Sequence, residues 1–161
     1  MEELHKKNRT GKEYFYMIIK KYNSIKKIEE IYDELYNSLP KKHAFQSLSF
    51  LKQTDTLYYK LRWRSSVSYY VVFEQDKPIL IAGFRKYNKD TVILLGSRAG
   101  YDYCDIIWSN ENVFEDGIKL VFAELKRSKI KNIIWKFWEV DSYSFTTIKK
   151  LVNVVEINEV K

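Results

Sequence analysis

The sequence has few of the residues that most often build disulfides, metal centres and phosphate-binding loops. Its 161 residues include one cysteine, two histidines, five glycines and two prolines. The single cysteine, Cys104, excludes an internal disulfide and a zinc cluster built from cysteines, and it suits a reducing compartment. His5 stands in a polar N-terminal stretch and His43 in a connecting segment. Neither has the neighbouring partners that a general base or a metal ligand requires.

Long hydrophobic runs are also absent. No run approaches the roughly 18 apolar residues of a membrane span, and the N-terminus has no apolar run of signal-peptide length. We therefore expect a cytoplasmic protein with no membrane insertion. Hydrophobic residues make up 45% of the chain and aromatic residues 16%, which is enough for a packed core. The length fits one domain. We expect a flexible tail over 1–12 and a single domain over 13–161.

The chain is basic, with a formal net charge of +7. Basic surfaces attract nucleic acid and anionic lipid with little specificity. The lysines, however, come as scattered pairs with acidic residues among them: Lys6-Lys7, Lys20-Lys21, Lys26-Lys27, Lys41-Lys42 and Lys149-Lys150. This scatter favours a solvated surface, so we do not expect nucleic acid as a partner. A basic nucleic-acid-binding protein ranks third among the candidate functions.

Apolar patterning predicts strands and helices along the whole chain. Runs rich in β-branched and aromatic residues predict strands over 14–22, 67–73, 79–85, 91–95, 106–108, 130–138 and 152–160. Helical spacing of apolar residues predicts helices over 25–39, 48–61, 112–128 and 144–151. Turns at 74–78 and 88–90 would make an antiparallel meander of three strands. The expected fold class is α/β (α+β), with a mixed, largely antiparallel sheet flanked by helices.

Several residues sharpen this prediction. Ser47 can cap the second helix, and the segment 43–46 before it is expected to be a linker. Asn112 and Glu115 have the spacing of a capping box for the third helix. Gly117 inside that helix costs about 1 kcal/mol relative to alanine, which predicts close packing against a strand. Four residues from separate apolar runs are expected to be buried together in the core: Leu94, Ile106, Phe122 and Trp135.

The stretch from Thr91 to Trp108 holds the candidate site. Polar residues lie there between two apolar runs, and clusters of this kind between rigid elements often form binding sites. The candidate substrate-binding residues are Arg98, Tyr101, Asp102 and Tyr103. The alternative is a wide loop whose aspartates, Asp105 included, cap backbone N–H groups. Residues alone leave both interpretations open, and they identify no catalytic residue.

Two short segments resemble signatures of one protein family. The first is a Phe-Gln-Ser-x-x-Phe segment, here Phe45, Gln46, Ser47 and Phe50. The second is a Leu-Gly-Ser…Asp-Tyr segment, here Leu95, Gly96, Ser97, Asp102 and Tyr103. Both resemble the cellulose-biosynthesis acetyltransferase (CelD/BcsL) family, a branch of the GNAT superfamily related to FemAB-type peptidyltransferases. The resemblance covers 14–155 and implies a GNAT-like domain corresponding to the N-terminal half of such a protein.

One feature of the family is missing from this sequence. Family members carry, in a second GNAT-like half, a glycine-containing loop expected to hold the pyrophosphate of an acyl-CoA. Such a loop presents backbone N–H groups at a helix start, and no such loop is found in this sequence. We therefore expect no cofactor in this chain alone, with acetyl-CoA or another acyl-CoA bound only if a second GNAT-like half is supplied. The expected partner is such a second GNAT-like half or a second copy of this chain in a homodimer.

The resemblance implies acyl transfer to an amine or hydroxyl of a cell-surface polysaccharide or peptide precursor. The sequence leaves open whether the chain is itself an enzyme. The alternative function is a non-catalytic protein-interaction module that retains the GNAT-like fold.

Overall fold

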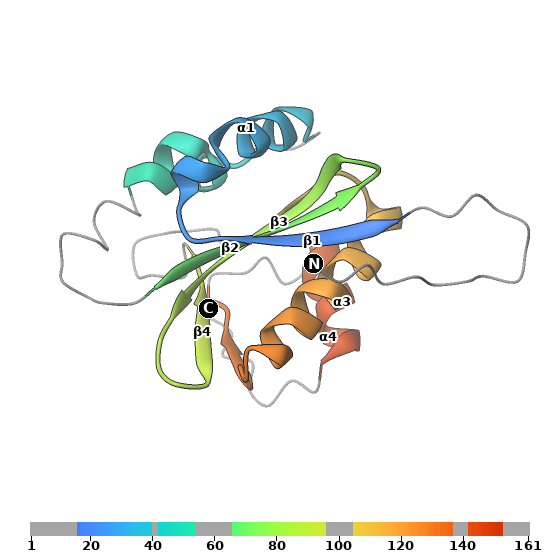
Figure 1. The fold of residues 1–161 in the computed structure, drawn as a ribbon. Helices are drawn as coiled ribbons and strands as arrows, with labels where there is room; N and C mark the ends of the chain where they lie inside the picture. The colour runs from blue at the N-terminus through green and yellow to red at the C-terminus, as the bar shows by residue number, and fades with distance from the viewer. Residues whose placement is uncertain (1–15, 40–41, 54–65, 96–104, 137–141, 153–161) are drawn as a thin grey trace, which may run out of the picture.

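A computed structural model describes residues 16–39, 42–53, 66–95, 105–136 and 142–152. Within them, a six-stranded sheet lies between two layers of helices (Figure 1). The strands are β1 (Met17–Tyr22), β2 (Val67–Glu74), β3 (Lys77–Lys86), β4 (Thr91–Leu94), β5 (Ile107–Trp108) and β6 (Asn132–Ile134). The helices are α1 (Glu29–Ser38), α3 (Glu111–Arg127) and α4 (Tyr143–Leu151), with 3-10 turns η1 (Ile25–Lys27) and η2 (Ala44–Gln46). Residues 48–53 are helical as well.

The sheet is mixed and largely antiparallel, which confirms the expected fold class. Its order is β1-β2-β3-β4-β6, and β5 pairs with β3. The pairs β1–β2, β2–β3, β3–β4 and β3–β5 are antiparallel, whereas β4 and β6 are parallel. The helix α3 connects β5 to β6, and a crossover of this kind is what parallel pairing requires. The strand expected over 152–160 lies outside the described residues from 153 onward.

The connection between β2 and β3 is tighter than the expected five-residue turn over 74–78, so that prediction is wrong. Only Gln75 and Asp76 separate the strands, and their φ angles are 48° and 64°. Positive φ at both central residues is the mark of a type I′ hairpin turn. Pro78 lies inside β3 opposite Phe73, where the register shifts between Val72 and Phe73. Proline is tolerated in a strand at such an irregularity, so it did not end the strand.

Each face of the sheet has its own core. On one face, α3 and α4 cover a cluster that includes Leu80, Phe84 and Phe114. On the other face, α1 and residues 48–53 cover a cluster that includes Tyr69 and Val71. Alternation along the strands separates the two clusters, because successive strand residues point to opposite faces.

The predicted core is correct for two of its four members. Leu94 and Ile106 are 2% and 3% exposed. Phe122 and Trp135 are only partly buried and pack against the same cluster. The fully buried aromatic ring of α3 is instead Phe114, which is 0% exposed.

The start of α3 also differs from the prediction. The helix begins at Glu111, and its cap is Asn110, whose side chain accepts a hydrogen bond from the N–H of Asn112 at 3.1 Å. Asn112 and Glu115 therefore do not form a capping box. Gly117 does pack against β3, because a Cβ placed there would lie 3.2 Å from Leu80 Cδ1.

Candidate functional site

The strand that should pair along the whole of β3 is interrupted. β4 pairs with one part of β3 through Phe84 and Leu94, and β5 pairs with another through Leu80 and Trp108. A continuous partner in the β4 register would place position 98 opposite Leu80. Position 108 lies there instead, so the registers of the two pairings differ by ten residues.

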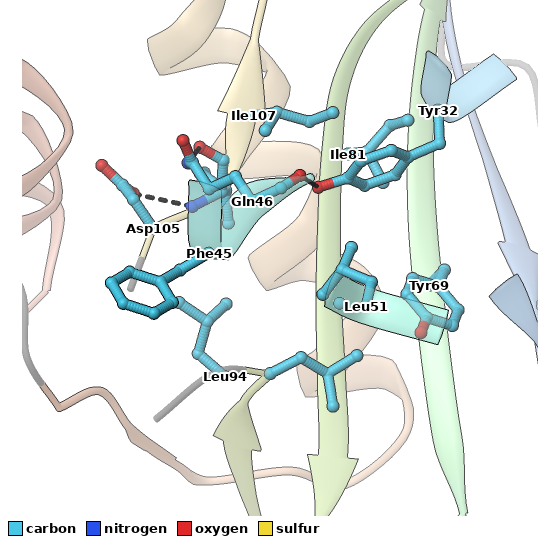
Figure 2. A pocket seen from close by; sticks show the side chains of 12 residues that line it. Tyr32, Phe45, Gln46, Leu51, Tyr69, Ile81, Leu94, Asp105 and Ile107 are labelled. Carbon is cyan, nitrogen blue, oxygen red and sulfur yellow. Dashed lines mark hydrogen bonds between the residues drawn. The ribbon is translucent and has the colours of Figure 1, made fainter. Parts of the chain in front are cut away.

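A small pocket lies at this interruption (Figure 2). Its volume is about 20 Å³, which is room for one water molecule. Ligand pockets for small molecules are usually several hundred Å³, so the described residues form only a wall of any larger site. The lining comes from α1, η2, residue 51, strands β2 to β5 and the residues next to β4 and β5: Tyr32, Phe45, Gln46, Leu51, Tyr69, Ile81, Gly83, Leu94, Leu95, Asp105, Ile106 and Ile107.

Gln46 joins three elements at the pocket. Its side chain is 6% exposed, and its Nε2 donates to the carbonyl of Ile106 at 3.2 Å. Its own main-chain carbonyl accepts a hydrogen bond from the hydroxyl of Tyr32 at 2.7 Å, as Figure 2 shows. The expected linker over 43–46 is therefore an ordered turn that buries a polar side chain, which corrects the prediction. A buried amide must find partners inside the protein, and those partners fix the turn.

The residues on either side of Gln46 have structural contacts. The rings of Phe45 and Phe50 meet edge to face, with centroids 5.3 Å apart. The hydroxyl of Ser47 accepts a hydrogen bond from the N–H of Phe50 at 3.3 Å, as a helix cap does. The cap predicted at Ser47 is thus confirmed.

Asp105 ends the interruption and is held from two sides. One carboxylate oxygen accepts a hydrogen bond from the N–H of Ile106 at 2.8 Å. The other accepts a hydrogen bond from the hydroxyl of Ser144, which is fully buried. Ser144 Oγ also lies 3.0 Å from the hydroxyl of Ser142, the N-cap of α4. Asp105 therefore caps a backbone N–H, as the alternative interpretation of this stretch expects, and it fixes the sheet to α4.

Gly83 forms the wall of the pocket on β3. A Cβ at this position would lie 2.7 Å from Leu95 Cδ1 and 3.1 Å from Tyr69 Cε1. Real Cβ atoms are not found as close as the first of these distances. The absence of a side chain here lets Leu95 pack against β3 directly after β4 ends.

The predicted substrate-binding residues, Arg98, Tyr101, Asp102 and Tyr103, lie outside the described residues, as does Cys104. Ser144 and Tyr32 were not predicted. Their roles depend on contacts with residues distant in sequence, and no local pattern marks them.

The described residues contain no group of three or more His, Cys, Asp or Glu side chains that could hold a metal ion. No helix among them is both long and apolar enough to cross a membrane.

The connection between β5 and α3 consists of Ser109 and Asn110. The N–H of Ser109 donates to the carbonyl of Ile79 at 2.9 Å, so the chain continues the strand up to this residue. Asn110 then accepts from the first turn of α3. A pyrophosphate at a helix start needs several free backbone N–H groups on a loop without bulky side chains. This connection has no glycine, and its cap already occupies one of those N–H groups.

Comparison with known proteins gives remote structural likeness only. No family model matches the sequence, and no curated protein matches it. One similar solved structure is an aminoglycoside acetyltransferase, meta-AAC0020, from an uncultured soil metagenomic sample in complex with sisomicin. It has 9% identity and a TM-score of 0.49, with 90% of this chain and 93% of that chain covered.

Two further solved structures show a comparable likeness. A GNAT family acetyltransferase of Staphylococcus aureus has 16% identity and a TM-score of 0.46, with 90% of this chain and 98% of that chain covered. Glucosamine-6-phosphate N-acetyltransferase from Arabidopsis thaliana has 11% identity and a TM-score of 0.47, with 90% and 97% covered.

Proposed function

We propose that this chain is a GNAT-like acyltransferase domain of the CelD/BcsL type, acting on an amine or hydroxyl of a cell-surface polysaccharide or peptide precursor. One observation carries the proposal. The two signature segments are about fifty positions apart in the sequence, yet Phe45 and Gln46 from the first and Leu95 from the second line the same pocket. Signature residues that meet at one place in the fold are more readily explained by a shared site than by chance.

The pocket suits an acyl-acceptor group, an amine or a hydroxyl, that can donate a hydrogen bond. Asp105 is partly exposed there, and an ionised carboxylate has several lone-pair sites at which hydrogen-bond donors can bind. An acceptor amine or hydroxyl can donate to such a carboxylate, and the ring of Phe45 lies beside it as an apolar wall (Figure 2). Because Ser144 and the N–H of Ile106 hold the carboxylate, it is positioned before a ligand binds.

The acyl donor is proposed to come from elsewhere. The two-residue connection before α3 is a poor cradle for a CoA pyrophosphate, so a second GNAT-like half would supply that site. For the chain alone at 0.15 M salt, calorimetry with acetyl-CoA should give a dissociation constant weaker than about 1 mM. A micromolar dissociation constant that does not change with salt would contradict the proposal that the acyl-CoA site lies outside this chain.

Acceptor binding is tested separately, by amide chemical shifts. Glucosamine, a cello-oligosaccharide and a lysine-containing peptide serve as probes. We expect at least one of them to shift the signals of Gly83, Leu95 and Ile106. Asp105→Asn should weaken that response, whereas Asp116→Asn on the exposed side of α3 should not. If no probe moves these signals, the acceptor role is wrong.

A non-catalytic interaction module is the second candidate. It is favoured by the fact that Gln46 and Asp105, the polar groups of the pocket, already hydrogen-bond within the protein. Shifts from none of the three acceptor probes, with the fold intact, would favour this function.

A further inference from the structure

Five exposed lysines gather at one end of the sheet. Lys86 and Lys89 lie at the turn from β3 to β4. The others are exposed residues at the end of α3 and in its connection to β6: Lys126, Lys129 and Lys131. Figure 1 shows the β3–β4 turn and the start of β6 at the same end of the molecule. We call these lysines, together with Tyr87 between the first two, the basic end.

Hydrogen bonds fix the two segments of the basic end to each other. The N–H groups of Lys131 and Asn132 both donate to the carbonyl of Asp90, at 2.8 and 3.1 Å. The first parallel pair of β4 and β6, Thr91 with Asn132, follows directly. The N–H of Tyr87 donates to the carbonyl of Thr91 at 2.9 Å, which closes the turn. The lysines therefore belong to one rigid surface, although about forty positions separate the two segments.

The positive charge of this surface is only partly offset nearby, since Asp90 is the one acidic residue in the β3–β4 turn. Within the described part of the chain, none of the five lysines forms a salt bridge. Of the neighbouring acids, Glu124 is paired with Arg127 at 2.6 Å. The helix α1, in the layer on the other face of the sheet, carries four acidic residues and no basic one. Among the described residues the charges are thus unevenly distributed, and an anionic surface would orient the protein with the basic end inward.

Tyr87 supplies an apolar group at the centre of this charge. It is 60% exposed, which makes it one of only two exposed large hydrophobic residues in the described ranges; the other is Tyr16. Tyrosine favours the boundary between water and lipid, because its ring is apolar and its hydroxyl is polar. Single-stranded nucleic acid would need several aromatic rings for successive bases, and the basic end offers only this one among the described residues.

We propose that the basic end binds peripherally to an anionic phospholipid surface, with the lysine ammonium groups at the lipid phosphates and Tyr87 at headgroup level. Basic residues near such a surface each add about fivefold to binding, and the effect weakens with salt. The inference rests on charge and geometry and does not depend on the proposed acyl transfer.

Sedimentation of the full chain with lipid vesicles tests the proposal. One set of vesicles contains phosphatidylcholine alone, and the other contains equal parts of phosphatidylcholine and phosphatidylglycerol. We expect binding to the anionic vesicles that decreases steeply with added salt, and no binding to the neutral ones. Equal binding to both sets would overturn the proposal.

The lysines are tested by the triple variant Lys86→Gln, Lys89→Gln and Lys131→Gln. Its partition onto anionic vesicles should fall about 100-fold, from three factors of about five. Tyr87→Ser should reduce partition severalfold, and Tyr87→Trp should preserve it. Thermal unfolding midpoints close to that of the parent chain show that each variant is folded.

A matched control separates local from total charge. The variant Lys27→Gln, Lys77→Gln and Lys150→Gln removes the same charge from exposed positions elsewhere, in η1, at the β2–β3 turn and in the last turn of α4. Its partition should stay within about threefold of the parent chain, because exposed charges beyond a Debye length are screened. Equal losses in the two triple variants would overturn the proposal. Tighter binding of a single-stranded oligonucleotide, lost in the first triple variant only, would assign the surface to nucleic acid instead.

Discussion

Gln46 Nε2 donates a hydrogen bond to the main-chain carbonyl of Ile106, and sixty positions separate the two residues in the sequence. This contact ties the turn η2 to the strand β5 at the interruption beside β3. Both residues are buried, so breaking this bond would leave two polar groups without access to bulk water. The side-chain amide of Gln46 therefore helps to set the shape of the pocket.

Gln46→Ala should destabilise the protein by about 1–3 kcal/mol, because the Ile106 carbonyl is left buried without this donor. Urea unfolding measures the change. Gln53→Ala, at an exposed helical position, is the matched control and should stay within about 0.5 kcal/mol. A loss no larger than that of the control would show that water replaces the amide.

Ser144→Ala should cost about 1.5–3 kcal/mol, the range for a hydrogen bond to a charged group. The serine hydroxyl donates to the carboxylate of Asp105 and is fully buried. A double-mutant cycle with Asp105→Ala isolates the pair, since residues in contact give non-additive effects. Additive losses in that cycle would contradict a direct interaction.

Gly83→Ala should destabilise by about 1–2 kcal/mol, which is typical of overpacking. The new methyl group would meet Leu95 Cδ1, which can rotate away, and the buried ring of Tyr69, which has less freedom. Gly117→Ala is the comparison. Its closest contact is a looser 3.2 Å, and alanine gains about 1 kcal/mol of helix propensity, so its net effect should be near zero. The reverse order in chemical denaturation would contradict the packing described here.

Phe114→Ala should cost about 3–5 kcal/mol, the range for a fully buried phenylalanine. Phe122→Ala should cost clearly less, because Phe122 is only partly buried. Both rings belong to α3, so helix propensity changes equally in the two variants. Similar unfolding free energies for both would move Phe122 into the core.

Stability at alkaline pH should depend on Tyr70. Burial raises the pKa of its hydroxyl, and the nearby charge of Glu124 raises it further. The folded protein therefore favours the protonated form. The contribution is complete below the unfolded pKa of about 10 and is lost as the pH rises through the folded pKa. Tyr70→Phe should unfold with a flatter pH dependence above that value, and parallel curves for the two proteins would exclude this linkage.

Local sequence patterns predicted which segments form helices and strands better than the residues at which these begin and end. Period and residue type are local properties, so the meander and the amphipathic helices followed from the sequence. The start of α3 did not, because the N–H of Ser109 still pairs with Ile79 and the strand continues further than the pattern indicates. The sequence does not show this hydrogen bond, so the capping-box spacing of Asn112 and Glu115 led us to place the start of the helix at 112.

The core and the site were harder to predict for a related reason. Phe114 and Phe122 both belong to α3, but Phe114 is fully buried and Phe122 only partly buried, and this difference depends on packing that the sequence pattern does not contain. The contacts of Gln46 and Ser144 join segments far apart in the chain. Family resemblance identified Gln46 as a residue of interest, but not its partner. Ser144 carried no signal, since a buried serine beside a helix cap is common.

The pairing of β3 with β4 and β5 does not depend on the number of residues that connect these two strands. Since β3 is paired on both sides of the break, the sheet does not dictate how many residues join Leu95 to Asp105. Doubling the length of such a connection costs only about 0.6 kcal/mol in closure entropy. Insertions and deletions there would be tolerated far more readily than in the β2–β3 turn, where two residues set the strand register. Evolution could therefore alter what borders the pocket without redesigning the fold.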